Sequence, residues 1–187
     1  MTSDKKTLCE EAKIVYQEAD CLFSKQQVED AMDVMAVSIT EKLVNVNPVS
    51  MCVMNGAIIP AGCLLNRLDF PMEVDYLHAT RYQDKFRGGK LEWIRHHSVS
   101  IKDRVVLLID DILDEGVTLK CIKEYCEAEG AKKVYIAVLA NKLHDRKVDI
   151  QAEFVGFDVE DRYLFGYGMD YKGYLRNAPG IFAVKGL

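Results

Sequence analysis

The sequence predicts an α/β fold in which a mainly parallel central sheet is flanked by helices. Short apolar runs that suit buried parallel strands alternate with segments of helical periodicity. Their order of strand, loop, helix and strand implies right-handed crossover connections. The length of 187 residues and the apolar and aromatic content of 49% are those of one globular domain with its own core. We therefore expect a layered domain rather than a disordered or fibrous chain.

The charge balance and the cysteines limit the possible partners and compartments. A formal net charge of −5 argues against a general nucleic-acid binder, which needs a surplus of Lys and Arg. No stretch approaches the roughly 20 apolar residues of a membrane span, and the polar start MTSDKKTLCEEAK is neither a secretory signal nor a transit peptide. Six cysteines without a C-x-x-C pair are expected to be reduced thiols packed as small hydrophobes. We expect a cytoplasmic protein without a zinc site, since His96 and His97 would point to opposite faces of a strand.

The first 45 residues are predicted to be helical. Ser24 and Gln27 have the spacing of a capping box. Apolar residues then recur at helical spacing and predict a face toward the core, at Val28, Ala31, Met32, Met35, Ala36, Ile39 and Leu43. Pro48 ends this segment, and residues 49–54 are predicted to form a buried strand that ends at Asn55-Gly56. A helix over residues 58–68 and a strand over residues 72–79 follow.

The second half of the chain continues the alternation of strands and helices. Residues 80–90, TRYQDKFRGGK, are polar, rich in basic residues and contain a Gly-Gly pair, which is typical of a mobile loop. Strands are predicted over residues 91–96, 104–111, 134–140 and 154–157. A helix is predicted over residues 117–129, between Gly116 and the C-terminal stop at Gly130. The chain contains no internal repeat and no linker that would divide it.

Residues 110–118, DDILDEGVT, hold the densest group of chemically useful side chains. A strand end delivers Asp110 and Asp111, and a short turn delivers Asp114. Gly116 lets the backbone turn tightly, so that amide groups and the Thr118 hydroxyl face the start of a helix, where phosphate is the usual ligand. Carboxylates beside a phosphate can hold sugar hydroxyls or Mg²⁺. Because ligands of parallel sheets bind beyond the carboxyl ends of the strands, the segment predicts a phosphosugar site with Mg²⁺.

Other interpretations of this segment are weaker. A Walker B strand also ends in acids, but the sequence contains no G-x-x-x-x-G-K-[ST] motif. Gly166-Tyr167-Gly168 begins a dinucleotide fingerprint, but Tyr171 stands at the place of the third glycine. Acids that merely end a strand do not require a third carboxylate, a glycine and a hydroxyl within nine residues.

The motif IDDILDEGVTL resembles the phosphoribosyl-pyrophosphate motif of type I phosphoribosyltransferases. The rest of the chain resembles the 6-oxopurine (hypoxanthine-guanine) branch of that family over about residues 20–184. Asn55-Gly56 resembles its pyrophosphate loop, and Lys142 resembles its purine-reading lysine. The sequence FVGF at 154–157, followed by DRYLFGYGMDY at 161–171, resembles its C-terminal purine hood. The resemblance implies transfer of 5-phosphoribosyl from phosphoribosyl pyrophosphate to N9 of hypoxanthine or guanine, which releases pyrophosphate and gives IMP or GMP.

The resemblance also implies roles for the residues of the phosphosugar site. Asp110 and Asp111 hold the ribose hydroxyls, directly or through Mg²⁺, and Asp114 lies near purine N7 as the general base. Asp170 binds a second Mg²⁺ on the pyrophosphate, and Arg176 neutralises that leaving group. The backbone amides and the hydroxyl of one short segment cradle the 5-phosphate, at Glu115, Gly116, Val117 and Thr118.

For the purine, the resemblance implies that Lys142 donates to O6, which adenine lacks. Tyr163 stacks on the ring, and the Leu164 carbonyl meets the 2-amino group of guanine. Residues 80–90 act as a lid that excludes water. Two residues depart from the family pattern. Asn55 stands where many relatives carry a lysine, so backbone amides are expected to contact pyrophosphate, and Arg81-Tyr82 stands where a Ser-Tyr pair is common in the lid.

The resemblance implies one domain over residues 1–187, with a core at about 45–150 and a hood built from the N-terminal helical segment and about 151–187. A homodimer or homotetramer is expected. The competing function is a non-catalytic regulator of the same fold that binds nucleotides. Such a protein typically lacks the base or the hood residues, whereas Asp114 and Lys142 are present here. An adenine or pyrimidine phosphoribosyltransferase is opposed by Lys142 and by Tyr163-Leu164.

Overall fold

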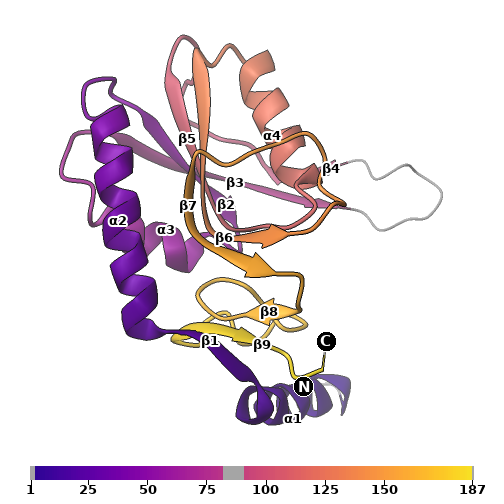
Figure 1. The fold of residues 1–187 in the computed structure, drawn as a ribbon. Coiled ribbons are helices and arrows are strands. Elements are labelled where there is room, and N and C mark those ends of the chain that lie inside the picture. The colour runs from indigo at the N-terminus through magenta and orange to yellow at the C-terminus, as the bar shows by residue number, and fades with distance from the viewer. Residues whose placement is uncertain (1–2, 82–90, 187) are drawn as a thin grey trace.

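A computed structural model describes residues 3–81 and 91–186 of the chain. Six strands form the larger sheet in the order β4-β3-β2-β5-β6-β7 (Figure 1). Neighbouring strands are parallel except for β3 and β4, which are antiparallel. The strands are β2 (Val49–Met54), β3 (Glu73–Arg81), β4 (Leu91–Arg95), β5 (Val105–Leu113), β6 (Lys133–Leu143) and β7 (Phe154–Glu160). This arrangement confirms the predicted α/β class with a mainly parallel sheet.

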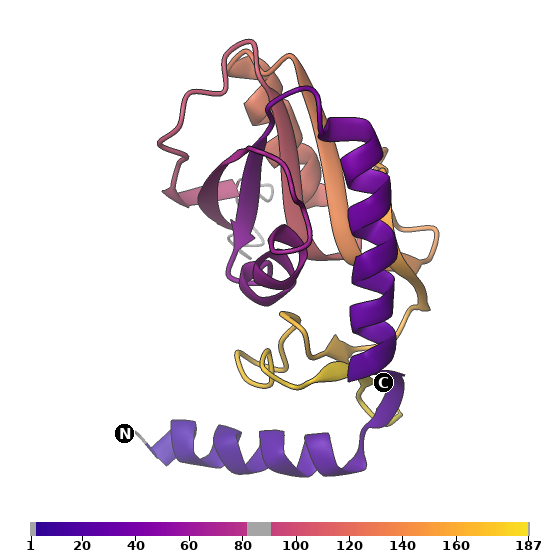
Figure 2. The ribbon, with the colours of Figure 1, turned by 90° about the vertical axis from the view of Figure 1, so that its left-hand side faces the viewer.

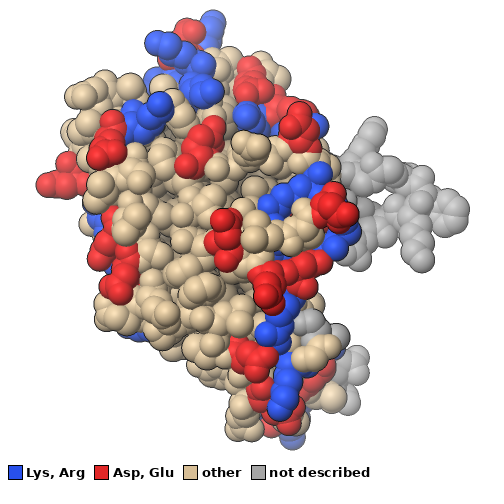
Figure 3. Space-filling view, viewed as in Figure 1, with Lys and Arg blue, Asp and Glu red and all other residues tan. Residues whose placement is uncertain are grey.

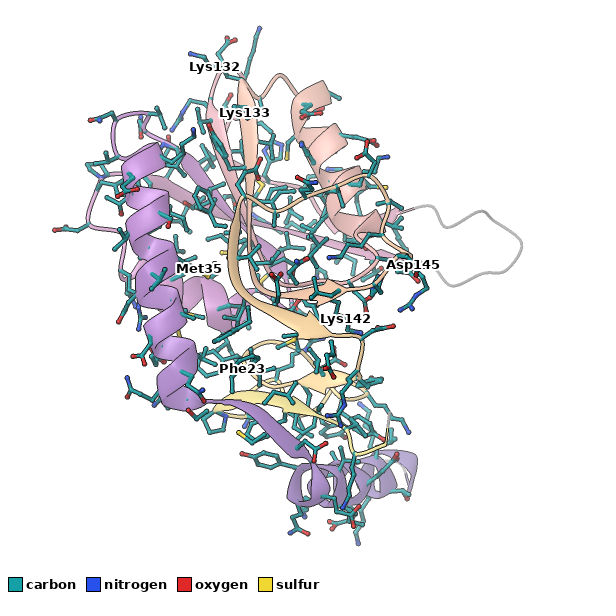
Figure 4. All side chains as sticks on the ribbon, viewed as in Figure 1. Phe23, Met35, Lys132, Lys133, Lys142 and Asp145 are labelled. Carbon is teal, nitrogen blue, oxygen red and sulfur yellow. The ribbon has the colours of Figure 1, made fainter. Side chains whose placement is uncertain are left out.

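Helices α2 (Lys25–Leu43), α3 (Ile58–Leu65) and α4 (Val117–Ala128) cover this sheet. The capping box of Ser24 and Gln27 is present at the start of α2. The predicted stripe of α2 is buried, except that Ala31 is only partly so, and the helix packs along β7. Figure 4 shows Met35 on this side of α2, and a β-carbon at Gly156 in β7 would lie 3.2 Å from its sulfur. The period of the apolar residues therefore located the core face of α2 correctly.

The prediction of a helix across the first 45 residues is wrong at one place. Helix α1 (Ser3–Glu18) ends before a short strand, β1 (Asp20–Ser24), which pairs with β9 (Gly180–Ala183) near the other end of the chain. Strand β9 also pairs with β8 (Leu164–Phe165), so β1, β9 and β8 form a second, antiparallel sheet, which we call the hood sheet. A strand whose partner lies about 160 residues away leaves little local signal.

Aromatic side chains connect the hood sheet to its surroundings. The ring of Phe23 in β1 stacks on Phe157 of β7, with 3.9 Å between ring centroids. On the other side, Tyr16 of α1 makes edge contacts with Phe165 and Phe182 at 6.0 and 5.1 Å. Figure 2 shows α1 lying across the end of the molecule beneath the hood sheet. The hood sheet is thus packed between α1 and the larger sheet.

Several predicted boundaries shift. Strands β5 and β6 continue to residues 113 and 143, where Ile112 still pairs with Ala140, because backbone pairing does not require apolar side chains. Asp110, Asp111 and Lys142 therefore lie within strands. Helix α3 ends at residue 65 instead of 68. Thr80 and Arg81 belong to β3 instead of the predicted loop, and the remaining lid residues 82–90 fall outside the described residues.

The prediction for the histidine pair is also wrong. His96 and His97 follow β4 instead of lying within a strand, and both rings pack against Tyr125 of α4, at centroid distances of 5.3 and 5.7 Å. The six cysteines are free, as predicted. Burial raises the pKa of Cys126 to about 12 and that of Cys52 to about 11, so these two thiols are protonated packing groups. Cys21, by contrast, is exposed. None of the helices described in residues 3–81 and 91–186 is long and apolar enough to cross a membrane.

Candidate active site

A cavity of about 680 Å³ opens where the carboxyl ends of β2, β5 and β6 face the hood. Apart from the lid pair, Arg81 and Tyr82, every predicted site residue lines it. These residues are Asn55, Gly56, Asp110, Asp111, Asp114, Glu115, Gly116, Val117, Thr118, Lys142, Tyr163, Leu164, Asp170 and Arg176. Of the lid pair, Arg81 ends β3 and Tyr82 lies outside the described residues. The fold therefore gathers into one pocket residues that are up to about 120 positions apart.

Two adjacent carboxyl groups form the floor of the cavity. The Asp111 backbone N–H donates to Asp110 Oδ1 at 2.9 Å. Burial raises the pKa of Asp110 well above its usual value, and the neighbouring Asp111 charge raises it further. Burial also raises the pKa of Asp111. The Arg176 guanidinium, whose Nη1 lies 3.8 Å from Asp111 Oδ2, opposes this rise through its positive charge. Asp111 is buried and Asp110 is partly buried, and the pair has one guanidinium beside it. A further cation is therefore favoured, and the carboxylate oxygen atoms are ligands that Mg²⁺ prefers.

Glycines allow the hood and the β2 loop to meet this floor closely. A β-carbon at Gly56 would lie 2.3 Å from Asp111 Oδ2. At Gly168, where φ is +109°, a β-carbon would lie 2.2 Å from the Gly56 carbonyl oxygen and 3.1 Å from Asp111 Cβ. The Met54–Asn55 peptide that precedes Gly56 is cis. Neither position leaves room for a side chain, because the Asp111 carboxyl group fills the space at Gly56 and the Gly56 backbone fills it at Gly168.

Replacing Gly168 with alanine is expected to destabilise the protein, because the new methyl group would meet backbone and the residue would keep a left-handed conformation. We expect the free energy of unfolding to fall by about 1–3 kcal/mol. Gly62 is the matched control, since it lies exposed in α3 and a β-carbon added there would meet nothing within 4 Å, and Gly62→Ala should raise that free energy by about 0.4–1 kcal/mol. Denaturant unfolding measures both values, and equal shifts would contradict the proposed close contact.

The turn before α4 is built for an anion. Gly116 occupies the N-cap position with a left-handed φ of +81°, and α4 extends for 12 residues behind it. Its first backbone N–H groups have no partner within the helix, so they and the Thr118 hydroxyl are available to the cavity that they line. The Val148 N–H donates to the Glu115 carbonyl at 2.9 Å and anchors the turn from outside. The geometry suits a phosphate group.

Asp114, which directly precedes this turn, also lines the cavity and lies between two donors. Lys142 Nζ donates to its Oδ2 at 2.8 Å, and His144 Nε2 lies 2.7 Å from its Oδ1. Burial acts to raise the pKa of Asp114, but the hydrogen bonds from Lys142 and His144 outweigh it, and the pKa falls below its usual value. Asp114 is therefore held as a carboxylate with a donor on each oxygen. The sequence did not predict the His144 contact.

A second acid extends this cluster. Asp161 Oδ1 lies 3.6 Å from Lys142 Nζ, and its Oδ2 lies 2.7 Å from Arg146. Asp114, His144 and Asp161 each bring one ligand atom within 4.8 Å of the others, which is the spacing of a metal site. Lys142 and Arg146 already supply positive charge to both carboxylates, so the cluster is balanced by side chains. The predicted metal ligands are different residues, Asp110, Asp111 and Asp170.

The hood also contributes lining residues to the cavity. Figure 4 shows Lys142 between the larger sheet and the hood sheet below it. Tyr163 is 41% exposed and presents its ring to the cavity, with Tyr171 in edge contact at 5.5 Å. Leu164 is buried in β8. Arg176 pairs with Asp170 at 2.6 Å and donates to the Gly168 carbonyl at 2.6 Å. The hood thus supplies an aromatic ring, a carboxylate and a guanidinium.

Sequence reasoning also missed His78, which lines the cavity beside the β2 loop. His78 pairs with Met54 in the register of β3 with β2, immediately before Asn55-Gly56. Only that register brings it to the site. Ile112 and Met169 add apolar lining, and although both lie within the quoted motifs, the sequence assigned neither of them a role.

Comparisons with known proteins agree with this geometry. Residues 18–172 match the family model described as "Phosphoribosyl transferase domain". The chain is 31% identical to a hypoxanthine-guanine phosphoribosyltransferase of Bacillus subtilis, over 88% of this chain and 92% of the relative. It is 30% identical to a hypoxanthine-guanine-xanthine phosphoribosyltransferase of Tritrichomonas foetus, over 88% and 90%. A crystal structure of a hypoxanthine phosphoribosyltransferase from Staphylococcus aureus superimposes with a TM-score of 0.87 at 26% identity, over 92% of this chain and 95% of that one.

Proposed function

This chain belongs to the phosphoribosyl transferase family, and from that premise we propose how its own residues carry out purine salvage. The enzyme is of the hypoxanthine-guanine type. It transfers the 5-phosphoribosyl group of phosphoribosyl pyrophosphate to N9 of hypoxanthine or guanine and releases pyrophosphate with IMP or GMP. One observation carries the proposal: a single cavity joins the turn at the start of α4, the adjacent carboxyl groups of Asp110 and Asp111, the Asp114–Lys142 pair, and Tyr163 of the hood.

At the phosphosugar end, Glu115 to Thr118 hold the 5-phosphate through backbone amides and the Thr118 hydroxyl. Asp110 and Asp111 hold the ribose hydroxyls, and Asn55-Gly56 contacts the pyrophosphate through its amides. Asp170 and Arg176 complete the pyrophosphate side, where the guanidinium neutralises charge on the departing group. Support comes from the 2.6 Å Asp170–Arg176 pair and from the position of Gly56 against Asp111.

Magnesium fits the carboxylate groups of this end. The raised pKa values of Asp110 and Asp111 follow from burial and mutual proximity, and a cation near them favours their ionised forms. We propose that Asp110, Asp111 and Asp170 hold Mg²⁺. When bound, the ion supplies positive charge to the pyrophosphate oxygens.

At the purine end, Lys142 donates to O6, Tyr163 stacks on the ring, and the Leu164 carbonyl accepts from the 2-amino group of guanine. Asp114 accepts the proton that purine N7 loses as N9 bonds to C1 of the ribose and pyrophosphate departs. Adenine carries an amino group where Lys142 requires an acceptor, so it is disfavoured. The carboxylate state and burial of the Asp114–Lys142 pair support these assignments.

The proposal extends to the organisation of the enzyme. Residues 1–187 form one catalytic domain, with a core at about 45–150, a hood from both ends of the chain, and a lid at about 80–90 that includes Arg81 and Tyr82. The partners are phosphoribosyl pyrophosphate and a 6-oxopurine, and the assembly is a homodimer or homotetramer. Free cysteines favour a cytoplasmic location. Acidic and basic side chains interleave on the face shown in Figure 3, which does not favour a nucleic-acid partner.

Release of pyrophosphate tests the function directly. Purified protein with phosphoribosyl pyrophosphate, Mg²⁺ and hypoxanthine should form IMP, whereas adenine should form no product. Removal of divalent cations with EDTA should abolish turnover, and added Mg²⁺ should restore it. Absence of product with hypoxanthine, guanine and xanthine would instead favour a nucleotide-binding regulator.

A further inference from the structure

His144 makes direct contact with the proposed base but belongs to no motif that the sequence suggested. Its Nε2 lies 2.7 Å from Asp114 Oδ1, and its side chain is only 4% exposed. It comes from the loop after β6, thirty residues along the chain from Asp114. A buried imidazole in a stretch as charged as residues 142–147 is held there by specific contacts.

The second ring nitrogen determines which form of the imidazole is present. The Arg146 backbone N–H donates to His144 Nδ1 at 3.2 Å. Nδ1 is therefore an acceptor, and in the neutral ring the proton lies on Nε2. The Nε2–H group then donates to the Asp114 carboxylate. His144 is thus an oriented neutral donor, fixed at both nitrogens.

Lys142, by contrast, does not keep its hydrogen bond to Asp114 throughout the proposed reaction. Its ammonium group donates to Asp114 Oδ2 and also lies 3.6 Å from Asp161. In the proposed function, this same group turns to O6 of the purine. Any such movement weakens its hold on Oδ2, while the bond from His144 to Oδ1 involves no atom that the substrate uses.

We propose that His144 is a positioning residue, which holds the Asp114 carboxylate toward the purine through its Nε2–H while Lys142 engages O6. The inference rests on the role proposed for Asp114. As N9 bonds to C1 of the ribose and the C1–oxygen bond to pyrophosphate breaks, the N7 proton passes to the free lone pair of an Asp114 oxygen. His144 neither gains nor loses a proton, since Nε2 already carries one and Nδ1 accepts from the backbone.

Three variants separate positioning from packing. His144→Phe keeps a planar ring in the buried site but removes the donor. His144→Gln keeps an N–H group at similar reach, and His144→Asn carries the same amide on a shorter side chain. His97→Phe is the matched control, because this partly buried histidine packs on Tyr125 away from the cavity.

We expect His144→Phe to lower kcat by about 10- to 100-fold, the usual effect of a misplaced reacting group. The KM for phosphoribosyl pyrophosphate should stay unchanged. His144→Gln should recover most of the activity, His144→Asn should not, and His97→Phe should match the wild type. In an Asp114→Asn background, His144→Phe should cause no further loss, because it acts only through the carboxylate.

Several results would overturn the inference. Wild-type kcat in His144→Phe would do so, as would equal losses with and without the Asp114 carboxylate. Where His144→Phe does not fold, equal activities of the Gln and Asn variants would be decisive against it. Failure of the proposed function looks different, since the wild-type protein itself would then form no product with any 6-oxopurine.

Discussion

Asp114→Asn is expected to lower kcat by about 10²–10⁴-fold, the range typical of a positioned acid–base group. The substitution keeps the size of the side chain and removes the carboxylate that we propose as the acceptor of the purine proton. In the structure, Asp114 receives a donor on each oxygen, from Lys142 and from His144. The amide nitrogen of Asn would face either Lys142 or His144, so the hydrogen bond from that donor would also be lost. Steady-state rates of IMP formation measure the effect.

Asp145 provides the control for Asp114. It is exposed on the loop after β6, and Figure 4 shows it beyond Lys142, away from the hood. Asp145→Asn removes the same charge from the same neighbourhood and should leave kcat unchanged. A change of less than about tenfold in Asp114→Asn, well below the range for a positioned base, would remove Asp114 from the proposed role.

Lys142→Ala is expected to raise the KM for hypoxanthine by about 10- to 100-fold. A hydrogen bond from a charged group contributes about 1.5–3 kcal/mol, and each 1.4 kcal/mol is about tenfold in affinity. The KM for phosphoribosyl pyrophosphate should change little, because Lys142 lies at the purine end of the cavity. Because Lys142 also donates to Asp114, kcat should fall too, which distinguishes it from a residue that only binds the base.

Lys132→Ala is the control for Lys142. Lys132 is exposed just before β6, and Figure 4 shows it at the far end of the sheet from the cavity. Its removal changes the net charge of the protein equally and should affect neither KM. Equal losses of affinity for hypoxanthine and for phosphoribosyl pyrophosphate in Lys142→Ala would contradict the O6 contact.

The grouping of Asp110 to Thr118 at one cavity was predictable because these residues are close in the sequence. Asp110 to Thr118 form one strand, one turn and one helix start, so local geometry alone brings them together. Local pattern also predicted the capping box at Ser24 and the buried face of α2. In each case the residues that carry the signal lie within one helix or within a strand, a turn and the start of a helix.

The grouping of Lys142, Tyr163 and Leu164 at the same cavity was predictable only through resemblance to a family. Alone, Lys142 looked like a solvated lysine in a charged stretch, and the sequence contained no sign that His144 would contact Asp114. The parallel pairing of β5 with β6 and the turn that follows bring Asp114, Lys142 and His144 together. His78 reaches the cavity by the same means, through the register of β3 with β2.

By itself, the sequence determined the α/β class, the tight turn at Gly116 before α4 and, by resemblance, the type of reaction. Apolar periodicity and a contiguous motif are local properties, so the order of the residues alone is enough to recognise them. Only the tertiary structure decided that residues 20–24 form a strand and that Asp114 has a fixed donor in His144. The backbone groups at a strand edge form hydrogen bonds with whichever strand lies beside it. A carboxylate likewise accepts from whichever donor the fold places next to it. Both depend on partners far away in the chain.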